Sequence, residues 1–337
     1  MNTPPRVSIG LAVYNGENYL RESLESLLAQ TFKDFELIIS DNASTDTTPQ
    51  ICEAYAAKDS RIRYYRNEKN LGGAVNMNLT ITMARGQYFK LAAHDDNCAP
   101  GFLARCVEVL DASPDVIVAY PDTVLIDDHG ELLTEPKPDD NDANYVRLMN
   151  SVHYVATDVT SPIKRFRAIL EAYHYWYPIF GLIRTEVLRE IPLFGAYPGG
   201  DQALLARLSL RGRFHEVPEK LFFLRRHASQ SINEGAISPQ LYCTWYDTAN
   251  VGRLLLPFWC KFLDYAAAIN HAPMGLGQKL QAYGYLIQSA NWKAMIKDLG
   301  IAALQLGDYF RGRLWKASNL GADSLLLNKY PRVTRLF

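Results

Sequence analysis

The clearest chemical signal in this chain of 337 residues is a pair of adjacent carboxylates, Asp95 and Asp96. They follow an apolar run over residues 88–93, which has the length of a buried strand, and Pro100-Gly101 marks a loop shortly after them. Two carboxylates at the end of a buried strand repel each other, and a divalent cation offsets that cost. Proteins often hold Mg²⁺ or Mn²⁺ through one or two carboxylates together with substrate phosphates. The alternative is a turn in which Asp96 or Asn97 caps the next helix, and these residues alone leave both interpretations open.

Polar residues also follow two earlier predicted strands. Tyr14-Asn15 comes directly after the apolar run of residues 7–13, and Asp41-Asn42 follows the run of residues 35–40. Turn chemistry alone does not readily explain three strand ends that bring polar groups to one edge of a sheet. The first strand-to-helix turn, residues 12–18, lacks G-x-G-x-x-G, and no P-loop sequence occurs in the chain. A nucleotide bound here would therefore be held by carboxylates and a metal instead of a glycine-rich cradle.

Regularly alternating strands and helices position these polar segments. The predicted strands cover residues 7–13, 35–40, 62–65, 88–93 and 116–120. The predicted helices cover residues 17–30, a segment beginning near Pro49, and residues 74–84 and 102–110. Alternation with short loops is typical of the α/β class and predicts a doubly wound, mostly parallel sheet. In such sheets ligands bind at the carboxyl ends of the strands, where the polar segments lie.

The composition argues against a nucleic-acid-binding protein, a disulfide-bonded secreted protein and a membrane-spanning protein. The formal net charge is −1, so no whole-protein field attracts nucleic acid, and we expect no nucleic-acid partner. The five cysteines show no C-x-x-C spacing, which fits a reducing compartment without a disulfide framework or zinc site. The N-terminus carries no apolar signal region, and no uncharged apolar stretch of about 20 residues occurs. We therefore expect a cytoplasmic protein without a membrane span.

An ordered set of short segments runs through the first part of the chain. The segments are Val7-Ser8-Ile9 through Tyr14-Asn15-Gly16, Ser26 to Thr31, Ile38 to Asp46, Asn70-Leu71-Gly72, Ala84 to Tyr88, and His94-Asp95-Asp96. Together they resemble the opening of a family 2 glycosyltransferase, whose metal-binding D-x-D element falls at the last segment. The resemblance covers about residues 6–120 and continues more weakly through Gly200-Asp201-Gln202 to Arg226-His227. It implies a GT-A fold, an inverting transfer from a UDP-, dTDP- or GDP-sugar donor, and a divalent metal, Mn²⁺ or Mg²⁺.

The resemblance also implies roles for individual residues. The residues implied to bind the donor are Ala12, Tyr14, Asn15, Asp41, Asn70, Asp95 and His227. Asp41 would accept hydrogen bonds from the base or ribose, and the segment from Ala12 to Asn15 would line the base pocket. The implied metal ligands are Asp95, Asp96 and His227, with Asp95 the main one, and Asp201 would be the catalytic base. Ala93 departs from the pattern, because many members carry the first aspartate of D-x-D there, so a ligand or supporting group is lost.

Local sequence leaves a structural alternative for several positions. Asp201 precedes a helical run over residues 202–210 and would also serve as its N-cap. His227 follows a predicted strand and would otherwise be a surface histidine in a basic cluster. Trp176, in an aromatic stretch, would either stack on the acceptor sugar or pack between subdomains. Lys90, inside the predicted strand before the aspartate pair, is interpreted as snorkelling to the surface.

With this resemblance, we expect the chain to divide into a GT-A catalytic domain over residues 1–238 and a helical C-terminal region over residues 239–337. The nucleotide-sugar half of the domain would span about residues 1–125 and the acceptor half about residues 126–238. The helices predicted in the C-terminal region cover residues 242–269, 278–288 and 291–306.

The end of the chain has a distinct composition. Beyond Tyr309 it carries six basic residues against Asp323 alone, interleaved with tryptophan and leucine. Such a mixture suits a peripheral contact with the inner face of the membrane. A homodimer interface and a solvated end to the helical region are the alternatives.

From these observations we expect a metal-dependent inverting glycosyltransferase that moves a sugar to a hydroxyl group of a glycan or lipid-linked acceptor. Bacterial surface polysaccharide or glycolipid assembly is the expected setting by family analogy. The runner-up, motivated by Ala93, is a catalytically silent nucleotide-sugar-binding or scaffold protein. A sugar-nucleotide pyrophosphorylase is disfavoured, because the chain has no early Gly-rich loop with a following Arg and Lys.

Overall fold

The computed structural model describes residues 3–133, 157–171, 177–228, 230 and 239–304 of the chain. Its strands are β1 (Val7–Val13), β2 (Phe35–Asp41), β3 (Ile62–Arg66), β4 (Tyr88–Ala92), β5 (Asn97–Cys98), β6 (Val116–Ile126), β7 (Leu182–Arg184) and β8 (Arg213–Arg225). They form one sheet in the order β3-β2-β1-β4-β7-β6-β8-β5. β2 and β4 are buried along their whole length, as expected for strands that helices cover on both faces.

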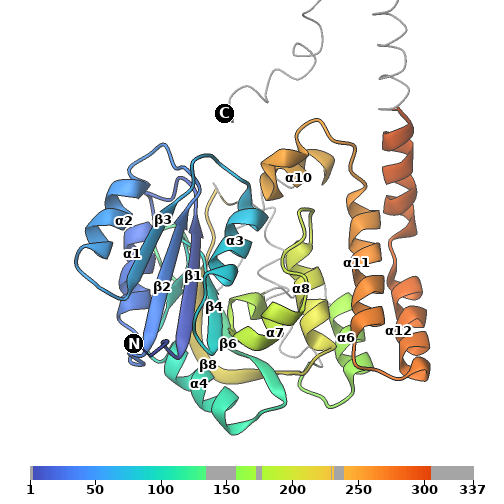
Figure 1. Cartoon of the computed structure of the whole chain (residues 1–337), viewed down its shortest axis with the longest axis horizontal. Helices are drawn as coiled ribbons and strands as arrows, with labels where there is room; N and C mark the ends of the chain where they lie inside the picture. Colours follow the sequence, from blue (N-terminus) through green and yellow to red (C-terminus); the bar gives the residue numbers. More distant parts are fainter. Residues whose placement is uncertain (1–2, 134–156, 172–176, 229, 231–238, 305–337) are drawn as a thin grey trace, which may run out of the picture.

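Helices lie on both sides of this sheet (Figure 1). They are α1 (Leu20–Leu28), α2 (Thr48–Ala56), α3 (Gly73–Thr82), α4 (Phe102–Ala112), α6 (Pro162–Glu171), α7 (Thr185–Glu190), α8 (Gly200–Ser209), α10 (Pro239–Tyr246), α11 (Pro257–His271) and α12 (Leu276–Ser289). Two short 3-10 helices, η1 (Tyr177–Phe180) and η2 (Thr248–Asn250), and a further helix over residues 292–304 complete the described elements.

The first four strands form the parallel, doubly wound part that the sequence predicts. β1 pairs in parallel with both β2 and β4, and β2 pairs in parallel with β3. β7 then runs antiparallel between β4 and β6, whereas β6 and β8 are parallel. The carboxyl ends of β1, β2 and β4 therefore meet at one edge of the sheet, and the predicted polar segments follow these ends.

Two hydrophobic cores pack against opposite faces of the sheet. α1, α2 and α4 contribute to one core, and α3, α6, α8 and α11 contribute to the other. In α1 the buried Leu20, Leu24 and Leu27 are spaced three and four residues apart, so they share the face that meets the sheet. Phe166 and Ile269 are completely buried in the second core, which the C-terminal helices help to build.

The C-terminal region begins with two helices where the sequence predicts one over residues 242–269. α10 ends at Tyr246, and α11 begins only at Pro257, whose missing amide hydrogen and fixed φ suit the first turn of a helix and not its interior. α10 packs on α3, α11 on α8 and α12 on α6. In the backbone, Thr248 N donates to Leu71 O at 3.2 Å, which fastens this region to the first half of the chain. None of the described helices is both long and apolar enough to cross a membrane.

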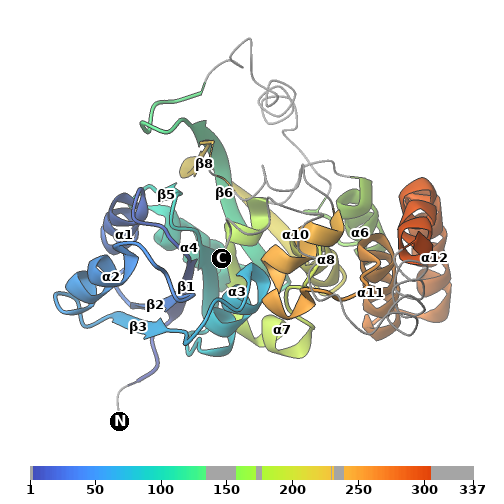
Figure 2. The ribbon, with the colours of Figure 1, turned by 90° about the horizontal axis from the view of Figure 1, so that it is seen from above.

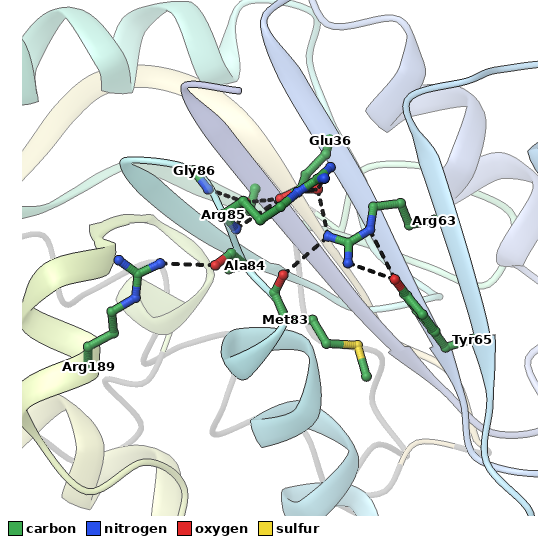
Figure 3. Close-up of polar contacts among 9 residues, drawn as sticks. Glu36, Arg63, Tyr65, Met83, Ala84, Arg85, Gly86 and Arg189 are labelled. Atoms are coloured by element: carbon green, nitrogen blue, oxygen red, sulfur yellow. Dashed lines mark hydrogen bonds and ion pairs between the residues drawn. The ribbon is translucent and has the colours of Figure 1, made fainter. Parts of the chain in front are cut away.

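A buried carboxylate joins three strands at the amino-terminal edge of the sheet, opposite the polar loops (Figure 3). Glu36 accepts hydrogen bonds from Ser8 Oγ at 2.6 Å and from Arg85 N at 3.0 Å. It also forms ion pairs with Arg63 at 2.8 Å and with Arg85 at 2.6 Å. Burial opposes its ionisation, but the hydrogen bonds from Arg85, Ser8 and Arg63 outweigh that effect and lower the pKa of Glu36. This cluster holds the sheet together and lies away from the candidate site.

Candidate active site

Hydrogen bonds join the loops after β1 and β2 at the carboxyl edge of the sheet. Asn42 N donates to Val13 O at 2.8 Å, and Asn15 N donates to Ser44 Oγ at 2.9 Å. Asn15 Oδ1 in turn accepts from Thr45 N at 2.8 Å. The segment that the resemblance assigns to the base pocket is therefore fixed to the loop that follows Asp41.

The same two loops contain the described non-glycine residues with positive φ, Asn15 at 51° and Ala43 at 62°. Non-glycine residues seldom adopt this left-handed conformation, and alanine has no polar side chain that would stabilise it locally. Strain of this kind gathers at functional sites, where the surrounding structure enforces it. Tyr14 is 41% exposed beside Asn15, and Ala12 is partly exposed near the end of β1, so both are accessible to a ligand at this edge.

Asp41 is completely buried at the end of β2. Its Oδ1 accepts from Ser44 N at 2.8 Å, and its Oδ2 accepts from Tyr64 OH at 2.9 Å. Arg66 Nε lies 3.4 Å from the same Oδ2. Both carboxylate oxygens thus have protein partners, and Asp41 organises the loop. A contact between Asp41 and a base would use a remaining lone pair or displace one of these partners.

Asn70 belongs to a network of amide side chains beneath the polar loops. Its Oδ1 accepts from Asn42 Nδ2 at 2.8 Å and from Gly72 N at 2.9 Å. Asn42 Oδ1 accepts from Asn67 Nδ2 at 3.0 Å and from Leu71 N at 2.9 Å. These bonds hold the loop of residues 67–72 against the end of β2, so Asn70 helps to shape the candidate base pocket.

Asp95 and His227 meet where β4 and β8 end. His227 Nε2 lies 3.1 Å from Asp95 Oδ2, and the two side chains are 6% and 15% exposed, respectively. Burial opposes the ionisation of Asp95, but the contacts with His227 and the nearby His94 lower its pKa. A carboxylate oxygen and an imidazole nitrogen are both common ligands of first-row metals. The structure therefore brings together two of the three residues that the sequence suggests as metal ligands.

Asp96 occupies a different environment from its neighbour. Its Oδ1 accepts a hydrogen bond from Arg225 N at 3.0 Å, and the residue is only 5% exposed. Burial and the charge of Asp95 raise the pKa of Asp96 well above its usual value. Asp96 therefore anchors the last strand, whereas Asp95 faces His227.

Arg225, which the sequence analysis did not single out, supports this pair. The residue is 1% exposed, and its Nε donates to Asp95 O at 2.9 Å. Its guanidinium forms an ion pair with Glu22 of α1 at 2.7 Å and lies 4.6 Å from the ring centroid of Tyr19. The Tyr19 ring lies 4.8 Å from the His227 ring. In the sequence Arg225 looks like part of a surface basic cluster, and only its position two residues before His227 hinted at this role.

Lys90 is buried, so the interpretation as a snorkelling side chain was wrong. It is 1% exposed, and its Nζ donates to Phe180 O at 2.9 Å. The ammonium also lies 4.3 Å and 5.2 Å from the ring centroids of Phe102 and Phe222. A carbonyl oxygen and two aromatic faces replace the water that this cation loses.

Asp201 belongs to a second group of polar residues, on α8. Gly199 is the N-cap of this helix with φ of 85°, so Asp201 lies in the first turn and not at the N-cap that local sequence suggested. Its Oδ1 accepts from Gln202 N at 2.8 Å. Burial raises the pKa of Asp201, while the hydrogen bond from Gln202 and the charge of Lys261 oppose that rise. A half-buried carboxylate with a raised pKa is suited to accepting a proton.

Lys261, from α11, lies beside the turn that carries Asp201. Its Nζ donates to Gln202 Oε1. A Cβ atom placed on Gly199 would lie 2.9 Å from the same Nζ, so the lysine passes directly over that glycine. The cation therefore lies against Gly199 and Gln202, close to Asp201, although it comes from a region in which the sequence showed no resemblance.

A buried polar cluster fixes α11 on α8. Asp264 accepts from Arg207 Nε at 3.1 Å and also from Tyr197 OH. Arg207 additionally donates to Pro192 O at 3.0 Å. The C-terminal region is thus held firmly at the position where it contributes Lys261.

Two predictions fall on residues that the structure does not describe. Trp176, the suggested acceptor-stacking residue, lies outside the described residues, and so does the basic end of the chain beyond residue 304. The acceptor contact of Trp176 and a membrane contact of that end remain predictions.

The chain belongs to glycosyl transferase family 2, whose model matches residues 8–185. The matched range includes Asp41 and Asp95 but ends before Asp201 and His227. The expected class, a glycosyltransferase with a GT-A sheet, is therefore confirmed.

Individual relatives agree with this class. An uncharacterised glycosyltransferase of Methanocaldococcus jannaschii is 36% identical over 137 residues, which are 40% of this chain and 47% of that protein. The putative glycosyltransferase EpsE of Bacillus subtilis is 37% identical over 131 residues, which are 39% of this chain and 47% of EpsE. The chain spans about half the length of the curated relatives it matches.

A solved structure shares the fold. The crystal structure of S. aureus TarS residues 1–349 in complex with UDP-GlcNAc matches with a TM-score of 0.60 at 19% sequence identity. The match covers 84% of this chain and 72% of that one, so it extends beyond the family match at residue 185.

Proposed function

We propose that this protein is an inverting glycosyltransferase that moves a sugar from a nucleotide-sugar donor to a hydroxyl group of a glycan or lipid-linked acceptor. The convergence of Asp95 and His227 at the sheet edge that also carries the strained loop after Asp41, in a family 2 chain, supports this proposal. The donor would be a UDP-, dTDP- or GDP-sugar, and UDP-GlcNAc, the ligand of TarS, is the first to test. The expected setting is the assembly of bacterial surface polysaccharide or glycolipid.

A divalent metal fits the residues at the end of β4. Asp95 and His227 offer one oxygen and one nitrogen ligand. Among the described residues no group of three or more His, Cys, Asp and Glu side chains could hold an ion by itself, so the phosphates of the donor would have to complete the coordination. Mg²⁺ and Mn²⁺ are often held by few protein ligands together with substrate phosphates. Asp95 and His227 would hold the metal with the donor diphosphate, while Asp96 and Arg225 keep the two strand ends together. The metal would stabilise the negative charge that develops on the leaving diphosphate.

The remaining chemistry falls to Asp201. Its carboxylate would accept the proton of the acceptor hydroxyl as that oxygen attacks the anomeric carbon of the donor sugar. The bond between the anomeric carbon and the diphosphate oxygen breaks, and the nucleoside diphosphate leaves with the bonding electrons. A single displacement of this kind inverts the anomeric configuration. The loops of Asn15 and Asp41 would hold the base and ribose, which fixes the donor for in-line attack.

Ala93 supports a second candidate, a nucleotide-sugar-binding protein without turnover. The side chain at this position offers no ligand, and Ala93 O accepts a hydrogen bond from Ser23 Oγ at 2.9 Å. Asp95 and His227 would then be the metal's protein ligands, and the affinity of the protein for the metal would fall when the donor diphosphate leaves.

Release of nucleoside diphosphate tests the proposal. We would incubate the protein with UDP-, dTDP- and GDP-sugars, with Mn²⁺ or Mg²⁺, in the presence and absence of an acceptor panel of glycans and lipid-linked sugars. Release that needs the metal and disappears in Asp201→Asn supports the enzyme. Donor binding without release from any donor, across the whole panel, would favour the silent binding protein.

A further inference from the structure

The C-terminal helices expose most of the large apolar side chains found on the surface. Of the thirteen large hydrophobic residues exposed in the described part of the chain, ten lie between Val251 and Leu304, and seven of these are on α12 and the helix over residues 292–304. Monomeric globular proteins rarely expose contiguous apolar patches beyond a few hundred Å². Figures 1 and 2 both place α12 and the helix over residues 292–304 at the rim of the molecule, on the side away from α1 and α2. The concentration of apolar groups at this rim indicates a contact surface.

The helix over residues 292–304 is anchored to α11 by one face. Met295, Asp298 and Ala302 are buried on this face, spaced three and four residues apart. Trp259 Nε1 donates to Met295 O at 3.0 Å, and Phe258 N donates to Asp298 Oδ2 at 2.8 Å. The orientation of this helix is therefore set by specific contacts.

A second apolar row runs along the same helix. Trp292, Ile296 and Leu299 are 44%, 67% and 47% exposed, and their spacing of four and three residues places them on one side. This side differs from the anchored one, so the helix is apolar on two sides. A helix of this kind normally has a partner on each of them.

α12 likewise has one buried side and a separate row of exposed apolar side chains. Ala282 and Leu286 are buried toward the rest of the protein. Leu276, Leu280 and Ile287 are 75%, 63% and 53% exposed at spacings of four and seven residues, which again is one side of a helix. Two consecutive helices therefore present rows of exposed aliphatic side chains.

The charge of this surface is of one sign. Residues 276–304 contain three lysines, Lys279, Lys293 and Lys297, and one carboxylate, Asp298, which is 2% exposed. The chain beyond residue 304 continues with six basic and two acidic residues. A symmetric dimer through this surface would bring the lysines of both copies into one interface, where residues 276–304 offer no exposed carboxylate to pair with them. Anionic lipid headgroups complement the lysines instead, and the apolar rows suit the boundary between headgroups and acyl chains.

We infer that α12 and the helix over residues 292–304 form a surface that binds peripherally to an anionic lipid bilayer. The exposed leucine, isoleucine and tryptophan side chains enter the interface, and Lys293 and Lys297 remain at the headgroups. The inference does not depend on the chemistry at Asp95 or Asp201, so it can fail while the proposed function holds.

Vesicle co-sedimentation of the full chain tests this inference. We expect binding to vesicles of phosphatidylglycerol and phosphatidylethanolamine in equal parts, and about tenfold weaker binding to phosphatidylcholine vesicles. The double variant Ile296→Glu, Leu299→Glu should bind the anionic vesicles at least about tenfold more weakly. Lys293→Gln with Lys297→Gln should also weaken binding. Leu132→Glu is the matched control, because Leu132 is 57% exposed but lies outside the C-terminal helices, and it should bind like the unaltered protein.

Three results would overturn the inference. One is the absence of binding of the unaltered protein to anionic vesicles. Another is unchanged binding of the glutamate double variant, whose fold is checked by its melting temperature and circular dichroism. The third is concentration-dependent dimerisation that the glutamate double variant abolishes while vesicle binding stays unchanged, which would assign the surface to a second copy of the chain.

Discussion

His227 Nε2 lies 3.1 Å from Asp95 Oδ2, and this contact joins the ends of β8 and β4 across 132 residues of sequence. Arg225 reinforces the junction, since its backbone N binds Asp96 and its side chain binds the carbonyl of Asp95. The two proposed metal ligands are therefore preorganised by one short segment, residues 225–227. Preorganised ligands lose little conformational freedom when an ion and a diphosphate bind.

Asp201→Asn should separate donor binding from turnover. Asparagine keeps the size of the side chain and its acceptor oxygen for Gln202 N, but it cannot accept the acceptor proton. We expect turnover to fall at least about 100-fold, while the donor binds with nearly unchanged affinity. Nucleoside diphosphate release and calorimetric donor titration measure the two properties. Normal turnover in this variant would remove Asp201 from the mechanism.

Lys261→Met should move the pH profile of kcat/KM. Burial already raises the pKa of Asp201, and the Lys261 charge opposes the rise. The base must be ionised, so activity is lost as pH falls through the pKa of Asp201. Without the lysine charge the pKa of Asp201 should rise further, so this loss should begin at a higher pH than in the unaltered protein. The other titratable groups around Asp201 are Tyr246 and Tyr265, whose pKa values burial raises, and they remain neutral.

Two further variants make the Lys261 experiment decisive. Lys261→Arg keeps the charge and should keep the profile. Lys279→Met is the matched control, because Lys279 Nζ donates to Asn270 O at the far end of α11. If the activity of Lys261→Met falls by the same factor at every pH, Lys261 has only a structural role and its charge does not tune Asp201.

Glu36→Gln should destabilise the fold in a pH-dependent way. The Glu36 side chain is 4% exposed and pairs with Arg63 and Arg85, so its removal should cost about 2–3 kcal/mol of unfolding free energy at neutral pH. The pKa of Glu36 is lower in the folded protein than its unfolded value of about 4.3. Its contribution is therefore complete above that pH and is lost as pH falls through the folded pKa.

Urea unfolding at neutral and acidic pH measures this effect. The difference between Glu36→Gln and the unaltered protein should shrink at the acidic pH. Glu108→Gln is the control, since Glu108 is 67% exposed, and it should change stability by less than about 0.5 kcal/mol. An equal loss in both variants would contradict the structural role of the Glu36 cluster.

Gly72→Ala should loosen the attachment of the C-terminal region. Gly72 has φ of 95°, and an added Cβ would lie 2.6 Å from the backbone of Asp247. We expect a loss of more than about 1 kcal/mol in unfolding free energy. Gly284→Ala is the matched control, because nothing lies within 4 Å of its added Cβ and alanine favours a helix interior. If Gly72→Ala leaves the unfolding free energy unchanged, the backbone around residues 72 and 247 can shift to make room for the added Cβ, and the contact does not fix the C-terminal region.

The first half of the fold follows from the sequence because its strands and helices are locally encoded. The apolar runs that became β1, β2 and β4 are short, buried on both faces and bounded by polar loops. The leucine spacing of α1 likewise predicts its buried face. In the second half the sequence predicts the helical run that is α8 and a strand before His227. It does not predict β7, which has only three residues, Leu182–Arg184, and lies between strands that are remote in the sequence.

The sequence predicts the candidate site residues that follow the strand ends, but it does not predict the buried cations that hold those strand ends in place. Asp95 and His227 are marked by residue type and motif position, whereas Arg225 and Lys90 look like surface cations in the sequence. Only the three-dimensional structure reveals the carbonyl and aromatic partners that allow their burial. Lys261 is a similar case, because its neighbour Asp201 lies on another helix that sequence spacing does not relate to it.

Nucleotide-dependent thermal stabilisation, with metal and with EDTA, tests the central claim most directly. A ligand present at about 100 times its Kd stabilises the folded state by about 2.7 kcal/mol. We predict that UDP, dTDP or GDP raises the melting temperature in the presence of Mn²⁺, that EDTA removes the rise, and that Asp95→Asn lacks it. Asp128→Asn, a change at an aspartate whose side chain is 53% exposed, should behave like the unaltered protein. A rise that survives both EDTA and Asp95→Asn would contradict the metal site, and no rise with any nucleotide would contradict the proposed enzyme.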